Sequence, residues 1–193
     1  MVEIITNPPT IFHLAAHFEM ISPDMNQLLL QEGYAAAQIQ QALQQPGSKF
    51  SRTFAMEFKA IQEQLVHAQI KEEISDNGNI IRVATFSQKK YPDGIGTAGV
   101  IAIQALNKAQ QNQLKKVSNR GALLWQLSVE KLPATNTLSL ITRKENNVEI
   151  LVTCYPGEPG LPIPNDSMPA AFYALCKKYW EEHVFLVSEK LIN

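Results

Sequence analysis

The feature that most constrains the fold is a succession of three apolar segments, ALLWQLSVEKL (122–132), TLSLITRK (137–144) and VEILVTCY (148–155). Each has the length of a buried strand, and only the short polar turns PATN and ENN separate them. Turns this short join antiparallel neighbours, because a parallel pair needs a long crossover connection. The three segments therefore predict an antiparallel meander.

Helix patterns flank the predicted strands. Residues 1–72 are predicted to be helical, and the last helix-forming segment, RTFAMEFKAIQEQLVHAQIKEEI (52–74), has its large apolar residues near one face. After the SDNGN turn, IIRVATF (80–86) alternates as a strand, and residues 168–191 predict a closing helix. The expected class is α+β, with a helical N-terminal region packed on an antiparallel β-sheet and a C-terminal helix. The expected division is 1–72 and 73–193, as two regions or one continuous domain.

Composition restricts the class of protein. The 193 residues carry a formal net charge of −1, so the overall charge does not indicate a nucleic acid or an acidic membrane as partner. Cys154 and Cys176 show no CxxC or Cys/His spacing, which predicts free thiols in a reducing compartment. The N-terminus lacks the pattern of a signal peptide, and no run approaches the roughly 18 apolar residues of a spanning helix. We therefore expect a cytoplasmic protein without a membrane partner.

The stretch TCYPGEPG (153–160) is the strongest candidate for a functional strand end. Alternation places Thr153 and Tyr155 on one face of the strand, about 6–7 Å apart at their Cα atoms, and Cys154 on the other face. The prolines and glycines that follow stiffen the exit of the chain. The stretch is either a rigid structural turn or a segment that holds two hydroxyl donors in position.

Histidine is the natural proton shuttle near neutral pH. His67 lies near the C-terminal end of the third predicted helix, on the approach to the strand of Arg82, and is the candidate acid or base; a surface position is the alternative. His13 and His17 have the i,i+4 spacing of a two-histidine metal site, but no third ligand is obvious nearby, so a partly buried helix face is favoured. The chain has no HExxH or GxSxG motif, and GIGTAG (94–99) lacks phosphate-loop spacing. No metal or cofactor is expected.

Basic residues concentrate between positions 89 and 120, against the single Asp93. Such a stretch can attract a phosphodiester locally even in a nearly neutral chain; an ordinary solvated helix and loop is the alternative. Within it, residues 100–116 are expected to begin as a strand and continue as a helix. The candidate substrate-binding residues are Lys89, Lys90, Lys115 and Lys116.

The succession TLSLITRKENNVEILVTCYPG (137–157) resembles the sheet core of bacterial RNase toxins of the barnase–EndoU–colicin–RelE-like fold. In those proteins a strand beginning with Thr, a turn, and a strand ending in Thr-x-aromatic-Pro-Gly recur. The segment YPDGIGTAGVIAIQAL (91–106) is similar to an earlier piece of that fold, an aromatic-Pro loop and a glycine turn ahead of a helix. The resemblance covers residues 65–165.

The resemblance implies a metal-independent ribonuclease, a toxin or effector that acts in a target cytoplasm on RNA, tRNA included, and it allows an immunity protein as partner. Such cleavage needs an acid, a base and donors around a phosphorane. His67 would supply the acid or base, and Arg82 would hold the phosphate in the same cleft. Thr137, Thr153 and Tyr155 would donate hydrogen bonds from neighbouring strand ends. The alternative is a non-enzymatic protein-interaction module that binds its partner through the N-terminal helices.

Overall fold

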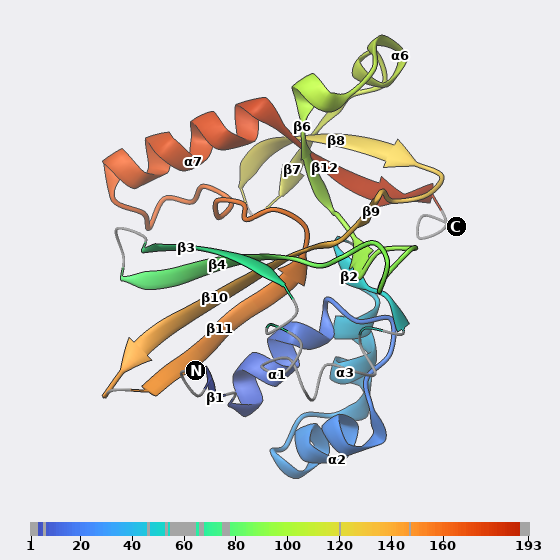
Figure 1. Ribbon diagram of the computed structural model, residues 1–193. Helices are drawn as coiled ribbons and strands as arrows, with labels where there is room; N and C mark the ends of the chain where they lie inside the picture. Colours follow the sequence, from blue (N-terminus) through green and yellow to red (C-terminus); the bar gives the residue numbers. More distant parts are fainter. Residues whose placement is uncertain are drawn as a thin grey trace.

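The computed structural model describes residues 4–5, 7–45, 47–52, 54, 65, 68–74, 78–119, 121–146 and 148–189, and Figure 1 shows their arrangement. The expected α+β class is confirmed, because these residues form both helices and mainly antiparallel sheets, with a helix near the C-terminus. The helices are α1 (Pro8–Ala15), α2 (Pro23–Gln31), α3 (Ala36–Leu43), the 3-10 helix η2 (Ile103–Ala105), α6 (Lys108–Gln111) and α7 (Ala170–Glu182). The strands are β1 (Ile4–Ile5), β2 (Lys49–Phe50), β3 (Gln69–Ile74), β4 (Asn79–Thr85), β5 (Gly96–Thr97), β6 (Val100–Ala102), β7 (Lys115–Asn119), β8 (Ala122–Val129), β9 (Ala134–Thr135), β10 (Thr137–Glu145), β11 (Val148–Pro156) and β12 (His183–Ser188).

Local capping starts the first two helices. The side chains of Asn7 and Ser22 each accept a hydrogen bond from the backbone N–H three residues further on, at 2.9 and 3.2 Å. Pro8 and Pro23 follow at the first helical position, where the missing N–H of proline costs no helix bond. Figure 1 shows α1, α2 and α3 together on one side of the strands, as the sequence predicts.

The central sheet has five strands in the order β1-β11-β10-β4-β3. The pairs β10–β11, β10–β4 and β3–β4 are antiparallel, while the short β1 runs parallel to β11. The register shifts within β11, because Ile141 lies opposite Thr153 but Thr142 lies opposite Leu151. Val152 is therefore the extra residue of a β-bulge, a feature that re-aims the side chains that follow it.

The first of the three apolar runs belongs to a different sheet, so the expected three-stranded meander is wrong. Strand β8 pairs with β7 and, in parallel, with β12, in a sheet of order β6-β12-β8-β7. The PATN segment does not return the chain to β8, because its strand β9 pairs with β5 in a third sheet of order β2-β5-β9. The chain thus passes from the four-stranded sheet, through β9 of the third sheet, to β10 of the central sheet.

Two segments expected to be helical, β3 and β12, are strands instead, and the helix expected to run to Lys116 gives way to strand β7 at Lys115. Strand β12 lies between β6 and β8, where Val184, Leu186 and Val187 are buried. Strand β3 pairs along its whole length with β4, and β7 pairs with β8. In each case pairing with a neighbouring strand overrides the helix propensity of the local sequence.

One apolar cluster joins the N-terminal helices to the central sheet, and it contains Leu14, Phe18, Phe50, Phe54, Leu138, Leu140, Leu151 and Cys154 among its buried members. A second cluster lies around the four-stranded sheet and includes Leu106, Leu127, Leu132, Val184 and Leu186. The helices thus share a core with the sheet that carries the strand end at 153–160. In the part of the chain that the structure describes, no helix is long and apolar enough to cross a membrane.

Candidate active site

The two faces of β11 have different surroundings. Leu140 lies opposite Cys154 in one neighbouring strand and opposite Arg82 in the other, so these three residues share a face of the sheet. Cys154 is fully buried there, and this burial raises the pKa of its thiol. The prediction that Cys154 belongs to the core is confirmed. Thr153 and Tyr155 lie on the opposite face.

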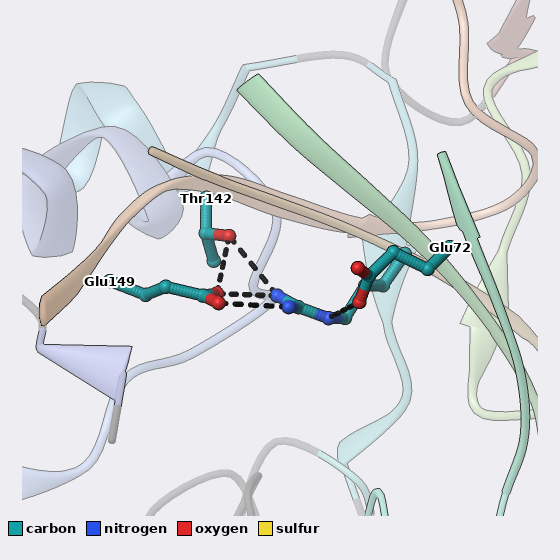
Figure 2. A network of polar contacts seen from close by, with 4 residues as sticks. Glu72, Thr142 and Glu149 are labelled. Carbon is teal, nitrogen blue, oxygen red and sulfur yellow. Dashed lines mark hydrogen bonds and ion pairs between the residues drawn. The ribbon is translucent and has the colours of Figure 1, made fainter. Parts of the chain in front are cut away.

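Arg82 contacts Glu72, Thr142 and Glu149 in a polar network on the core face, and Figure 2 shows the contacts with these three labelled residues. Its guanidinium binds both carboxylate oxygens of Glu149, with Nη2 at 2.9 Å from Oε1, and its Nε donates to Glu72 at 2.8 Å. The Thr142 hydroxyl donates to Glu149 at 2.7 Å. The hydrogen bond from Arg82 lowers the pKa of Glu149, and the same bond raises the pKa of Arg82. The expected place of Arg82 in a cleft with the hydroxyls of β11 is therefore wrong.

A pocket of about 380 Å³ lies on the opposite face, beside the end of β11. Its volume falls within the range of small-ligand sites, roughly 300–1,000 Å³. Helix α1, the GIGTAG loop, the loop after β11 and Trp180 of α7 all contribute to its walls. Most of the lining side chains are apolar, and the polar ones are His13, His17, Ser48, Thr153, Tyr155 and Glu158.

Glycines allow the walls of the pocket to approach one another closely. A Cβ atom on Gly99 would lie 2.5 Å from the backbone nitrogen of Ser48, so the GIGTAG loop must carry glycine there. Gly157 has a φ of +117°, a conformation that residues with a side chain rarely adopt. The first Pro-Gly of the strand end therefore needs its glycine to turn the chain over the pocket.

His13 and Thr153 form the polar contact at the edge of the pocket. Nε2 of His13 lies 3.2 Å from Oγ1 of Thr153, a hydrogen bond whose direction follows the tautomer of the imidazole. His13 comes from α1, and the β-bulge at Val152 sets the phase of β11 that brings Thr153 to this face. A histidine and a hydroxyl in contact at a pocket wall are suited to proton transfer.

His17 lies one helical turn further along the chain and is mostly buried. Its Nδ1 lies 3.1 Å from the carbonyl oxygen of Ser48, and a carbonyl only accepts, so Nδ1 carries the proton. Burial lowers the pKa of His17 to about 4, with smaller contributions from His13 and Lys49, while the bond to Ser48 raises it. At neutral pH the ring is therefore neutral, and its Nε2 is free of a proton.

Tyr155 and its neighbour Ser139 fasten the turn that follows β11. The Tyr155 hydroxyl accepts a hydrogen bond from the backbone N–H of Gly160 at 3.0 Å. Ser139, opposite Tyr155 in β10, donates its hydroxyl to the Gly157 carbonyl at 2.8 Å. Burial raises the pKa of Tyr155, so the phenol remains protonated at neutral pH. Tyr155 therefore fixes the stiff turn and also lines the pocket.

Of the five residues predicted to be catalytic, the structure brings Thr153 and Tyr155 together in the pocket. Thr137 begins β10, and its carbonyl accepts the N–H of Gly157 at 2.8 Å, but the residue is not part of the pocket lining that the structure describes. Arg82 lies on the other face. His67 lies outside the described residues.

The four lysines predicted to bind substrate do not line the pocket either, within the described part of the chain. Lys89 and Lys90 lie in the turn after β4. Lys115 and Lys116 begin β7 in the four-stranded sheet, where the Lys116 ammonium lies 4.9 Å from the ring centroid of Trp125. The basic stretch of the sequence is thus divided between two parts of the fold.

The sequence interpretation missed His13 and His17 as members of the site. The signal was present in their i,i+4 spacing, which places both on one side of α1 and the turn after it, but this spacing was interpreted as a partly buried helix face or a metal site and not as part of an active site. Among the described residues, no group of three histidine, cysteine or acidic side chains could hold a metal ion. Leu14 and Phe18, each one position further along, belong to the core, and the histidines lie to one side of them, toward the pocket.

No protein-family model matches the chain, and neither a curated protein nor a solved structure shows significant similarity to it. The chemistry of the site therefore has to be inferred from the residues of the pocket themselves.

Proposed function

We propose that the pocket is the active site of a metal-independent ribonuclease that cleaves RNA by transesterification. The observation that carries the proposal is the contact of His13 with Thr153 beside the neutral imidazole of His17. The resemblance of residues 137–157 to the barnase–EndoU–colicin–RelE-like toxins points to the same activity. The protein would then be a toxin or effector that acts on RNA, tRNA included, in a cytoplasm, with an immunity protein as its natural partner.

The reaction needs one unprotonated and one protonated group. A base removes the proton from a ribose 2′-hydroxyl, the 2′-oxygen attacks the phosphorus, and the 5′-oxygen leaves with a proton from an acid. His17 suits the base, because the Ser48 carbonyl holds its proton on Nδ1 and leaves Nε2 unprotonated. His13 is exposed and suits the acid, with Thr153 fixing the orientation of its ring. The products are a 2′,3′-cyclic phosphate and a 5′-hydroxyl.

The charge of the pocket determines how a nucleotide would sit in it. None of the described lining residues is a lysine or an arginine. The charge on the phosphate would therefore be met by hydrogen-bond donors of the pocket, His13 among them. The apolar walls suit the uncharged ribose and base, so the phosphate would lie near the histidines at the edge of the pocket.

Incubation of the purified protein with total RNA and with tRNA in excess EDTA tests this proposal. We expect discrete fragments with 2′,3′-cyclic phosphate and 5′-hydroxyl ends, and no fragments from an RNA whose 2′-hydroxyls are methylated. Intact RNA at high protein concentration would exclude the ribonuclease.

A protein-interaction module is the second candidate function. It is favoured by two large apolar side chains in the helical region, Met20 and Leu30, which are 46 % and 44 % exposed. Such a module would leave RNA intact, so the same incubation separates the two functions.

A further inference from the structure

Lys49 lies where two helices end beside the pocket. Its ammonium donates to the carbonyl of Ala16, the C-cap of α1, at 2.6 Å, and to that of Leu43, the last residue of α3, at 2.7 Å. A third, longer bond of 3.4 Å reaches the carbonyl of Phe18. The last carbonyls of a helix have no partner within the helix and lie at the negative end of its dipole. One cation therefore satisfies the ends of two helices.

The neighbours of Lys49 bind the same turn of chain. The backbone N–H of Phe50 donates to the carbonyl of His17 at 2.7 Å, and the carbonyl of Ser48 accepts from the His17 ring. Residues 48–50 thus hold residues 16–18 at several points. Strand β2 is fixed in turn by β5, where a Cβ atom on Gly96 would lie 2.3 Å from the Lys49 carbonyl oxygen.

We propose that Lys49 is a positioning residue for the pocket. Its ammonium fixes the end of α1 in the orientation that brings His17 beside Tyr155 and His13 beside Thr153. The ring centroids of His17 and Tyr155 lie 5.6 Å apart, so a small rotation of α1 about its end would separate the two side chains. Lys49 is not among the residues that line the pocket and acts through the histidines. The effect on catalysis rests on the proposed ribonuclease activity, whereas the effect on the histidines does not.

The Lys49 ammonium loses its proton at a lower pH than an ordinary lysine does. Burial lowers the pKa of its ammonium to about 8, and the carboxylate of Glu19 raises it. Helix α3 and strand β5 carry no ionisable side chain. The ionisable groups on the other segments beside β2 are His13 of α1, His17 of the turn after α1, and Glu149, Cys154 and Tyr155 of β11. The bonds from the ammonium are therefore expected to weaken in mildly alkaline solution.

The test compares Lys49→Met, Lys49→Arg and the control Lys108→Met, an exposed lysine on α6. The first readout is the NMR position of the His13 and His17 ring Cε1–H signals, which needs no substrate. Lys49→Met is expected to shift both signals and to lower kcat with little change in KM. An ångström-scale displacement of a catalytic group costs on the order of a hundredfold. Lys49→Arg, which keeps the cation, should restore most of the activity, and the control should behave as the unaltered protein does.

Unchanged histidine signals in folded Lys49→Met would overturn the proposal. If Lys49→Met does not fold, a pH titration of the unaltered protein and of Lys49→Arg decides. The His17 signal should move as the pH rises through about 8 in the unaltered protein, and it should not move in Lys49→Arg. Any other pattern contradicts the positioning role. If RNA is never cleaved, the ribonuclease proposal fails, and the NMR comparison still tests the role of Lys49.

Discussion

The imidazole of His13 lies 3.2 Å from the hydroxyl of Thr153, although 140 positions of sequence separate the two residues. Helix α1 supplies the histidine and the last strand of the central sheet supplies the hydroxyl. The contact exists because α1 packs against β11 over a shared core, with the histidine face of the helix turned toward the pocket.

Thr153→Val removes the hydroxyl from this contact and keeps the shape of the side chain. The loss of one positioned hydrogen-bonding group should lower RNA cleavage by on the order of tenfold to a hundredfold. Thr85→Val is the matched control, because Thr85 is an exposed threonine at the end of β4. Initial rates and circular-dichroism spectra of both variants provide the measurement. Equal activity of the two variants would remove Thr153 from the mechanism.

Arg82→Met should destabilise the protein without a specific effect on cleavage. The change leaves the carboxylate of Glu149, which is 4 % exposed, without its ion-pair partner. Removing one partner of a buried pair costs about 3–5 kcal/mol, and Glu149→Gln in the same chain should recover part of that loss. Urea unfolding of the single and double variants measures the free energies. Full stability combined with lost cleavage would instead support the phosphate-binding role that the sequence suggests.

Acid should destabilise the fold through His17. Its pKa is lowered from an ordinary value of 6.5 to about 4 in the folded protein, so between these pH values the unfolded chain binds the proton and the folded chain does not. The free energy of unfolding should therefore fall as the pH falls from 6.5 to 4, by as much as about 3 kcal/mol from this residue. Urea unfolding across this range, with His17→Gln as control, measures the difference. Identical pH dependence in both proteins would contradict the assignment of a neutral, buried ring.

The thiol of Cys154 should react slowly with a bulky reagent. It is fully buried on the core face of β11, and its pKa is raised, so little thiolate is available. Peptide mapping after timed labelling distinguishes it from Cys176, which is also buried. Modification of Cys154 at the rate of a free thiol in the native protein would mean that the faces of β11 are reversed.

The sequence predicted those features that depend on local pattern. The Ser-Pro-Asp start of α2, the hairpin of β10 with β11, and the opposite orientations of Cys154 and its two neighbours all follow from capping and alternation. The two partners of β12 could not be read in the same way, because β6 and β8 lie far from it in the sequence. Residues 183–188 continue a helix-forming stretch of the sequence. They form a strand because they pair with β6 on one side and with β8 on the other.

The candidate site was predictable in part. The strand end predicts Thr153 and Tyr155. Nothing local shows that α1 packs beside them, so the spacing of the histidine pair indicates only a helix face or a metal site. The sequence suggests a wrong place for Arg82, because the face it occupies depends on the register of β4 against β10 and of β10 against β11. The register makes the error visible, since Leu140 faces both Arg82 and Cys154.

The most direct test of the account is the rate of cleavage, in excess EDTA, of a DNA oligonucleotide that contains a single ribonucleotide. Cleavage should occur at that nucleotide alone, and His13→Ala and His17→Ala should each lower the rate by on the order of a hundredfold or more while the fold is retained. His67→Ala is the comparison, since the sequence alone assigned the acid or base to that residue. Full cleavage by both His13→Ala and His17→Ala, with activity lost only in His67→Ala, would contradict the assignment of the active site to the pocket beside β11.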